Sequence, residues 1–192
     1  EIEAKHMIID NCAHQLVVNP EQFDLIVTTN MNGDIISDLT SGLVGGLGIA
    51  PSANIGREVA MFEAVHGAAP DIAGKNIANP TAMILSAVMM CRFINLDKIA
   101  DTIENALAAT LDQGKFTRDL DKENGLSTTQ FTSEVIKNLG NKPKQFKSSS
   151  FKPIVLPHIH FPKVVPWRCI GFDIVIISDQ LYDDLVEKLT KI

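Results

Sequence analysis

The amino-acid sequence predicts an α/β fold, in which helices alternate with short strands. FDLIVTT at residues 23–29 is apolar, rich in β-branched residues and bounded by polar ones, as expected of a buried strand. VAMFEAV at residues 59–65 is a second candidate strand. Apolar residues at helical spacing occur on either side of these runs. The 192 residues are 45% hydrophobic, enough for one large domain or for parts of two.

The N-terminal third is predicted to hold two helices. The first covers residues 7–18 and is stopped by Asn19-Pro20. The residues that share its helical spacing are Ile9, Ala13, Leu16 and Val17. The second runs from about Asp34 to Leu43, where the sequence passes into glycines. Residues 49–56 are predicted to be a loop that leads into the strand at 59–65.

Three further helices are predicted from caps and periodicity. Asn79 is a good N-cap, and Pro80 suits the first helical position of an apolar helix that ends near residue 94. Because this helix is apolar almost all round, it is expected in a core. Asp97 is expected to cap the next helix, which ends before Gly114. Ser127-Thr-Thr-Gln fits a capping box for a helix that ends at Leu139-Gly140.

The composition changes after the last of these helices. Residues 141–153, NKPKQFKSSSFKP, are basic and polar and are predicted to be a linker. Residues 154–192 are expected to be a separate C-terminal extension with a strand at 172–178 and a helix at about 179–191. His158 and His160 have metal-like spacing on a strand, but without further ligands a surface or packing role is favoured.

Charge and cysteine content restrict the class of protein. A net charge of −6 and a pI near 5.3 argue against nucleic-acid binding and against a basic membrane patch. No apolar run approaches the roughly 20 residues of a transmembrane helix. The three cysteines are far apart, which predicts a reducing compartment, either cytoplasm or mitochondrial matrix. Because the sequence opens without Met inside a candidate element, we expect a fragment, a processed product or one chain of a split protein.

Two carboxylates are spaced for one face of a helix. Asp34 and Asp38 are four residues apart, so they repel each other unless a cation joins them. They are therefore candidate ligands for a hard cation such as Mg²⁺. The alternative is a pair of solvated acids in the first turn, where the helix dipole tolerates anions. Asp10 lies beside Ile9 in the first helix, and taken alone it indicates an exposed helix face.

The stretch HGAAPDIAGKNIANP, residues 66–80, is predicted to line a pocket. Its small residues allow a ligand to approach the backbone, and exposed N–H groups in such a loop can hold phosphate oxygens. The helix that begins at Asn79 adds a positive dipole end. His66 is a candidate to stack on a heterocycle, and a partly buried histidine without a ligand is the alternative. A G-x-G-x-x-G fingerprint after a strand is absent, so a Rossmann site is not predicted.

Two long motifs carry a family resemblance. NMNGDIISDLTSGLVGGLGIAPSANIG, residues 30–56, and FEAVHGAAPDIAGKNIANPTAMILSAVMM, residues 62–90, resemble the β-decarboxylating dehydrogenases, which act on isocitrate, isopropylmalate or homoisocitrate. The resemblance extends from residue 1 to about 140, and within the family it is greatest to isocitrate dehydrogenases. It implies an isocitrate/isopropylmalate dehydrogenase-like α/β fold and not a Rossmann fold. Residues after 144 resemble, more weakly, the C-terminal extension of some bacterial isocitrate dehydrogenases.

The resemblance implies a metal site and an overall reaction. Asp34 and Asp38 match the family's metal-binding aspartates, and Asp10 matches a third one that is lent across the family's dimer interface. A Mg²⁺ or Mn²⁺ ion there would chelate the hydroxyl and carboxylate of a 2-hydroxy acid. The implied reaction is oxidative decarboxylation of isocitrate to 2-oxoglutarate with hydride transfer to NAD, in the manner of the tricarboxylic acid cycle enzyme.

The resemblance also assigns the small-residue loop to the adenosine side of the cofactor. The matching positions are His66, Gly67, Ala69, Asp71, Ile72 and Asn79. A carboxylate at Asp71 would accept a hydrogen bond from a ribose 2′-hydroxyl and repel a 2′-phosphate. NADP-using relatives have Lys-Tyr at this pair of positions, so NAD is predicted. Arg118 is the residue that favours NADP, because its guanidinium could meet a phosphate.

The rest of the family's active site is expected outside this sequence. The substrate loop and the catalytic Tyr and Lys lie upstream in the family, so no general acid or base is assigned here. By resemblance, residues 1–45 belong to the small dimer-forming domain and residues 46–140 to the large cofactor-binding domain. Expected partners are isocitrate and a second copy or a complementary N-terminal half. The alternatives are an isopropylmalate dehydrogenase and a non-catalytic subunit or remnant of the same fold.

Overall fold

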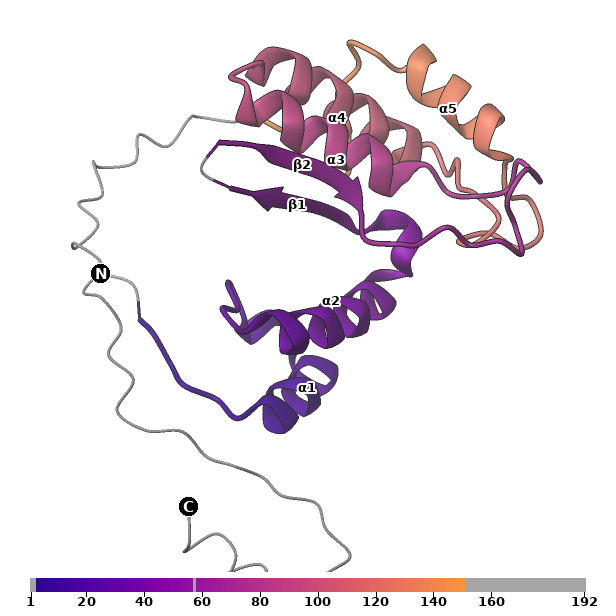
Figure 1. The fold of residues 1–192 in the computed structure, drawn as a ribbon. Helices are drawn as coiled ribbons and strands as arrows, with labels where there is room; N and C mark the ends of the chain where they lie inside the picture. The colour runs from indigo at the N-terminus through magenta and orange to yellow at the C-terminus, as the bar shows by residue number, and fades with distance from the viewer. Residues whose placement is uncertain (1–2, 57, 151–192) are drawn as a thin grey trace, which may run out of the picture. The chain divides into compact units, whose positions relative to one another are not determined.

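The computed structural model describes residues 3–56 and 58–150. In chain order, the regular elements of these residues are α1 (Ile9–Val18), the 3₁₀ turn η1 (Pro20–Gln22), α2 (Asn30–Val44), the 3₁₀ turn η2 (Leu47–Ile49), β1 (Pro51–Ile55), β2 (Ala60–Ala64), α3 (Thr81–Phe93), α4 (Asp97–Asp112) and α5 (Thr128–Lys137) (Figure 1). The expected extension at 154–192, with its strand and helix, lies outside the described residues.

Helices α1 and α2 share a small core. Cys12 and Leu16 of α1 are buried against Ile36 of α2. Helix α2 begins four residues earlier than the sequence predicts, at Asn30 after the N-cap Thr29. The expectation that Asp34 and Asp38 lie in the first turn was therefore wrong. The helix dipole does not reach beyond the first turn, so it does not account for this acidic pair.

The predicted strand at residues 23–29 was wrong. This segment has no strand assignment, and none of the described strands pairs with it. Leu25 is 81% exposed and Val27 is 87% exposed, whereas Phe23 and Ile26 pack against the α1–α2 core. A strand needs backbone partners on a neighbouring strand, and apolar β-branched composition does not supply them.

Strands β1 and β2 form an antiparallel hairpin in which Ala53 pairs with Phe62. The predicted strand at 59–65 is confirmed, but the predicted loop at 49–56 was wrong, because five of its residues form β1. The Ser86 hydroxyl joins this hairpin to α3: it donates to the Glu63 carbonyl (2.7 Å) and accepts from the Ser52 amide (3.4 Å). Figure 1 shows the hairpin lying along α3.

The three predicted helices are confirmed as α3, α4 and α5. Together they supply two further core clusters. Val88 and Cys91 of α3 pack with Ala100 of α4. The second cluster joins α4 to α5 and contains Ala106, Leu107, Phe131 and Val135. Ser127 and Gln130 form the predicted capping box. Asp97 is the first residue of α4 and not its cap, because the chain already accepts the first helical hydrogen bond at Leu96.

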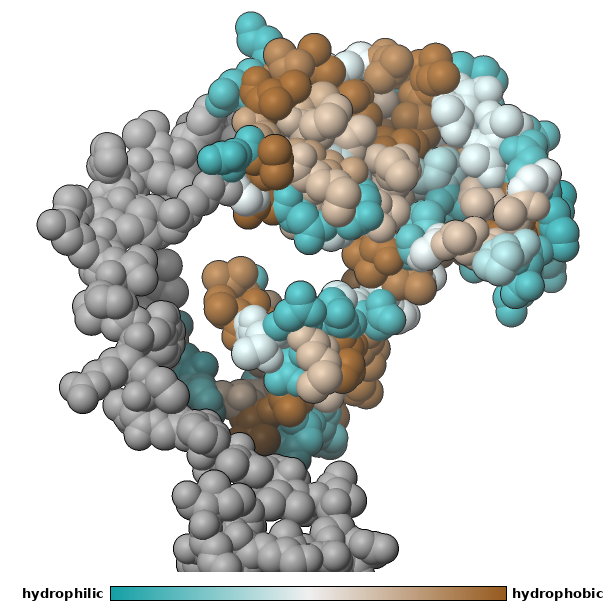
Figure 2. All heavy atoms as spheres, viewed as in Figure 1, coloured by the Kyte–Doolittle hydropathy of each residue, from teal (hydrophilic) through white to brown (hydrophobic). Residues whose placement is uncertain are grey.

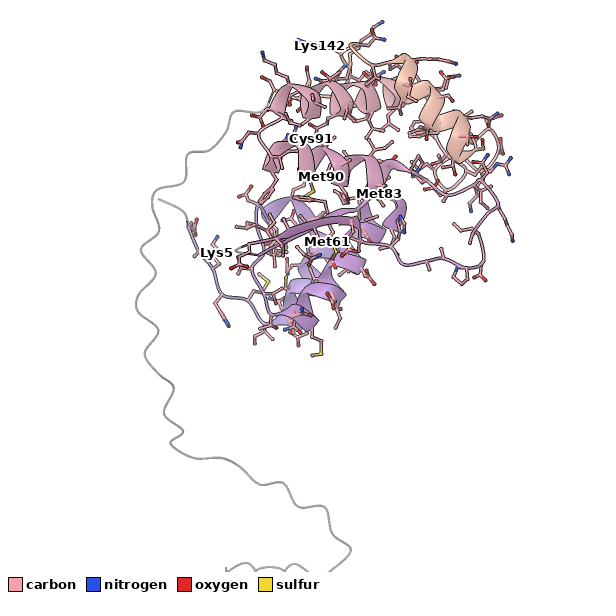
Figure 3. All side chains as sticks on the ribbon, turned by 45° about the horizontal axis from the view of Figure 1, so that its top comes forward. Lys5, Met61, Met83, Met90, Cys91 and Lys142 are labelled. Carbon is pink, nitrogen blue, oxygen red and sulfur yellow. The ribbon has the colours of Figure 1, made fainter. Side chains whose placement is uncertain are left out.

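One side of α3 is exposed, contrary to the expectation of an entirely buried helix. Figure 3 labels Met83 and Met90 on this helix and Met61 on β2, and their exposed fractions are 54%, 42% and 53%. Figure 2 shows hydrophobic residues on the visible surface of this part of the molecule. Residues 3–56 and 58–150 thus leave apolar surface uncovered.

Residues 141–150, called the strap below, have no helix or strand but are tied to α4. The Asp112 carboxylate accepts hydrogen bonds from the Lys144 and Gln145 amides, the latter at 2.9 Å. Seven residues earlier on the same helix, Asn105 bonds Ser149 twice: its Oδ1 accepts from the Ser149 amide (2.7 Å), and its Nδ2 donates to the Ser149 carbonyl (3.2 Å). The first part of the predicted linker therefore follows α4.

We predict that the strap's contribution to stability depends on pH through Asp112. Burial alone would raise the pKa of this carboxyl, but the Gln145 and Lys144 amides outweigh it, so the pKa lies below the ordinary value of 3.8. A depressed folded-state pKa stabilises the protein above the unfolded pKa, and that stability is lost as pH falls through the folded pKa. Asp112→Asn should therefore destabilise the chain at neutral pH, and its difference from wild type should shrink below pH 3.8.

Urea unfolding of both proteins across this pH range checks the prediction. Glu123→Gln is the control, because Glu123 is an exposed carboxylate for which no ion pair is found among the described residues. This variant should track wild type at every pH. A difference between Asp112→Asn and wild type that stays constant from about pH 7 to about pH 3 would contradict the assignment.

Candidate cofactor pocket and metal-ligating aspartates

The small-residue loop at 66–80 connects β2 to α3 and lines a cavity of about 630 Å³. Its own residues form one side of the cavity. The other side comes from η2 and from two positions much later in the chain, and these distant lining residues are Leu47, Gly48, Asp119 and Thr128. The pocket predicted from the small residues is therefore present in the structure.

Asn79 closes the end of this cavity nearest α3. Its side chain is buried, with Oδ1 accepting from the Thr81 amide (3.0 Å) and Nδ2 donating to Asp119 Oδ2 (3.0 Å). Gly48 allows the approach, because a Cβ at this position would lie 2.9 Å from Asn79 Cβ. The structure makes Pro80 the N-cap of α3 and Thr81 its first residue, so the predicted cap at Asn79 was wrong by one position. The Asn79 side chain still bonds the Thr81 amide and joins three separate segments in the pocket wall.

The structure places five of the six predicted cofactor residues on the cavity. His66, Gly67, Ala69, Ile72 and Asn79 all line it. His66 is half-buried, and its Nδ1 lies 3.0 Å from the Gly67 carbonyl oxygen. Asp71 is exposed and is not among the lining residues, and Arg118 is likewise exposed outside the cavity. The two side chains expected to decide between NAD and NADP therefore lie at the surface.

The predicted metal-binding aspartates are only partly gathered. Asp34 and Asp38 are exposed and lie one turn apart on α2, and neither carboxylate has a hydrogen bond or ion pair within residues 3–56 and 58–150. Two free carboxylates on one helix face suit a hard divalent cation. Asp10 lies in the first turn of α1, where its carboxylate accepts from the Asn11 amide (2.5 Å).

No cluster of three metal-ligating side chains occurs in the part of the chain that the structure describes. Asp10 is thus not brought to the Asp34–Asp38 pair within one copy. By the family resemblance the third aspartate comes from the partner subunit, and this assignment stays a prediction. The donor set available on α2 fits Mg²⁺ or Mn²⁺ but needs ligands from elsewhere to complete it.

Sequence reasoning missed four of the lining residues. Gly48 stood within a run of glycines that gave no sign of its individual role. Thr128 lay inside the predicted capping box, a pattern that indicates the start of a helix and carries no sign of a pocket. Asp119 and Leu47 carried no local signal, because their position depends on how distant segments pack.

No helix in the described residues has the length and apolar content that crossing a membrane requires.

Comparison with known proteins places these features in a family. A family model described as isocitrate/isopropylmalate dehydrogenase matches residues 1–136. The chain belongs to this family. Over 98% of the chain it is 53% identical to the isocitrate dehydrogenase [NADP] of Thermus thermophilus. It is also 55% identical over 72% of its length to the isocitrate/homoisocitrate dehydrogenase of the same organism.

Solved structures agree with the family's fold. The chain superposes with a TM-score of 0.73 on the TT0538 protein of Thermus thermophilus, at 56% identity over 80% of this chain and 34% of that one. It superposes with a TM-score of 0.68 on isocitrate dehydrogenase from Methylococcus capsulatus, at 47% identity over 69% of this chain and 40% of that one. The fold is therefore that of the isocitrate/isopropylmalate dehydrogenases, as predicted.

The chain spans only part of these relatives. It covers 39% of the Thermus NADP enzyme and 41% of the isocitrate/homoisocitrate enzyme. Other relatives carry different activities in their names: a mitochondrial isocitrate dehydrogenase [NAD] catalytic subunit of Arabidopsis thaliana is 51% identical over 72% of this chain and 37% of that subunit. The family is common to all of them, whereas substrate and cofactor differ.

Proposed function

We propose that this chain is part of an enzyme that oxidises and decarboxylates isocitrate to 2-oxoglutarate and passes the hydride to NAD. The observation that carries the proposal is the cavity formed by the 66–80 loop, together with the free carboxylate pair on α2. Relatives named isocitrate dehydrogenase, matching up to 98% of the chain, support the choice of substrate. A non-catalytic subunit is the less favoured alternative, since the matched aspartates and the His66-Gly67 pair are intact.

Asp34 and Asp38 would hold the metal ion, and Asp10 of a second copy would complete the protein's share of the ligands. A bound Mg²⁺ or Mn²⁺ polarises the substrate's oxygens and favours loss of the β-carboxylate. The chain's own contribution is the pair of carboxylates, which bind the cation through hard oxygen atoms and orient it from one helix face. The proton-transfer Tyr and Lys of the family are proposed to come from the portion that precedes this chain.

The pocket residues would bind the adenosine part of the cofactor. His66 lies at the cavity edge where it can meet the adenine ring, and Asn79 presents a fixed amide there. Asp71 supports NAD, because a carboxylate disfavours a 2′-phosphate. NADP is the second candidate: the relative that matches 98% of the chain is named for NADP, and Arg118 offers a positive charge beside Asp119.

The proposed organisation follows the family. Residues 1–45 would belong to the small dimer-forming domain, residues 46–140 to the large domain, and residues 154–192 to an appended extension after the 141–153 linker. The partners would be isocitrate and either a second copy or a complementary N-terminal part. The compartment would be bacterial cytoplasm or mitochondrial matrix, in line with the named bacterial and mitochondrial relatives. An isopropylmalate dehydrogenase would differ in the residues that recognise the substrate.

The test is formation of reduced nicotinamide, followed by absorbance, with the chain alone and with the N-terminal part of the Thermus relative added. Isocitrate and isopropylmalate are supplied separately, each with Mn²⁺ and with NAD or NADP. Turnover of isocitrate with NAD is expected once the N-terminal part is present. Turnover with NADP only would shift the cofactor assignment from Asp71 to Arg118, and turnover of isopropylmalate only would overturn the substrate.

We predict that Asp34→Asn and Asp38→Asn each lower the Mn²⁺-dependent rate by more than about 100-fold. The reason is that each variant replaces a charged oxygen ligand with a neutral amide. Glu21→Gln, an exposed acidic position outside α2, is the matched control and should leave the rate unchanged. Electron paramagnetic resonance of Mn²⁺ gives a second readout, since the variants should bind the ion more weakly even without turnover. Equal Mn²⁺ affinity in the variants and the control would remove these residues from the site.

A further inference from the structure

The N-terminus of α5 is bonded to the second half of the 66–80 loop. The Thr128 amide donates to the Asn76 carbonyl oxygen (3.0 Å), and the Thr129 amide donates to Asn76 Oδ1 (3.1 Å). In return, Asn76 Nδ2 donates to Thr129 Oγ1 (2.9 Å). One asparagine therefore makes three hydrogen bonds with the first two residues of a helix that begins 52 positions later in the chain.

These contacts satisfy amides that a helix leaves free at its start. The first four N–H groups of a helix have no partner within it. In α5, Asn76 takes the first two, and the Ser127 hydroxyl accepts from the third, Gln130 (3.3 Å). Thr128 Oγ1 adds a bond to the Ala78 carbonyl oxygen (2.6 Å). Asn76, Ala78 and Thr128 all line the cavity, so the joint is part of its wall.

The helix end that holds the loop is itself fixed. Phe131 and Val135 of α5 are 1% and 5% exposed and pack into the core shared with α4. Among the residues that the structure describes, the loop's first half has no comparable attachment. Residues 67–71 and 73–75 are exposed, and the backbone bonds of this half are local, such as those from the Ile72 and Ala73 amides to the Ala69 carbonyl. Fixation of the loop is thus concentrated at its second half.

The backbone at position 76 explains the residue type. Asn76 has φ +54°, in the left-handed region that asparagine and glycine adopt with little strain. Glycine would keep the backbone but lose both side-chain bonds to Thr129. Aspartate would keep the acceptor for the Thr129 amide and lose the donor. Substitutions at position 76 therefore separate the contribution of the side chain's hydrogen bonds to the attachment from that of the left-handed backbone.

We propose that Asn76 is a positioning residue: it attaches the loop to α5 and so sets the width of the nucleotide pocket. The nucleotide part of this statement rests on the proposed function. Asn76 acts here through the loop and not through the reacting atoms. Loosening the attachment of the loop to α5 should weaken binding of the nucleotide. It should leave the chemistry, and hence the rate at saturation, unchanged.

The test compares Asn76→Gly and Asn76→Asp with Asn95→Gly in the full chain. Asn95 is a matched control, because it is exposed and also left-handed, with φ +61°, and no side-chain hydrogen bond is found for it among the described residues. Hydrogen exchange of residues 66–80 is measured by mass spectrometry, and affinity for NAD and for NADP by calorimetry. KM for the nucleotide and kcat are measured separately on the chain mixed with the N-terminal part of the Thermus relative.

Asn76→Gly should accelerate exchange in the loop about tenfold and raise Kd and KM for the nucleotide by a similar factor, with kcat unchanged. Asn76→Asp should recover part of the loss, and Asn95→Gly should match wild type. Unchanged loop exchange in Asn76→Gly would overturn the proposal whatever the nucleotide does. Faster exchange in a chain whose wild type binds neither nucleotide would leave the attachment standing and overturn the proposed function instead.

Discussion

Gly125→Ala should destabilise the chain by about 3 kcal/mol or more. A Cβ at this position would lie 2.3 Å from the Asp121 carbonyl oxygen and 2.5 and 2.6 Å from the Arg118 Cα and amide nitrogen. All three are backbone atoms, so no side-chain rotation relieves the overlap. The same turn is held by Asp121 Oδ1, which accepts from the Glu123 and Asn124 amides at 3.1 and 3.0 Å. The chain can accept a methyl group here only by opening the turn.

Urea unfolding of Gly125→Ala measures this loss, with Gly42→Ala as the control. Gly42 lies in α2, and a Cβ there meets nothing within 4 Å. Alanine at position 42 should stabilise the chain slightly, by about 0.5–1 kcal/mol, because it replaces glycine inside a helix. Gly125 lies in the turn at residues 117–126, between α4 and α5. Equal unfolding midpoints for the two variants would show that this turn tolerates a side chain at Gly125. Since this turn also carries Asp119, which bonds Asn79 in the cavity wall, the variant should in addition weaken the proposed binding of a nucleotide.

Phe131→Ala should cost about 3–5 kcal/mol of unfolding free energy. The ring is 1% exposed and packs with Ala106 and Leu107 of α4 and with Val135 one turn later on α5. Truncation removes this apolar contact and leaves a cavity that helix backbones on two sides prevent from collapsing. Because α5 holds the 66–80 loop through Asn76, faster hydrogen exchange in residues 66–80 should accompany the loss.

Ile136→Ala is the matched control for Phe131, since Ile136 lies on the same helix and is 60% exposed. Its cost should stay within about 0.5 kcal/mol. Phe131→Leu should fall between the two, because it keeps part of the buried volume. If the alanine variants at positions 131 and 136 unfold at the same urea concentration, α5 does not depend on this core for its place.

The helices could be predicted because their signals are local. Asn79 and Ser127 act within a few residues of themselves, and the structure shows both side chains bonded to the start of a helix. Strands depend on a partner elsewhere in the chain. FDLIVTT at 23–29 has strand composition but no partner strand among the described residues, whereas PSANI at 51–55 has little strand character and pairs with β2. Propensity identified the wrong one of these two segments.

In the candidate site, too, the features that local patterns encode could be predicted. Asp34 and Asp38 share a helix face by spacing alone, and the small residues after His66 gave the pocket loop. Asp119 and Gly48 reach the cavity through tertiary packing around Asn79, which no local pattern encodes. Asp71 lies outside the lined cavity, and its recognition of the ribose stays a prediction. Its role depends on where the ligand extends beyond the pocket.

The bonds between Asn76 and Thr129 also constrain when the pocket can form. Their partners are separated by 53 positions, and closing so long a segment carries an entropic cost that only the later contacts repay. During synthesis from the N-terminus, the 66–80 loop leaves the ribosome well before α5 exists. The hairpin and α3 come earlier in the chain, but the loop lacks its bonds to Thr128 and Thr129 until α5 has formed. A ribosome stalled before Thr128 would therefore display a 66–80 loop that lacks its attachment to α5.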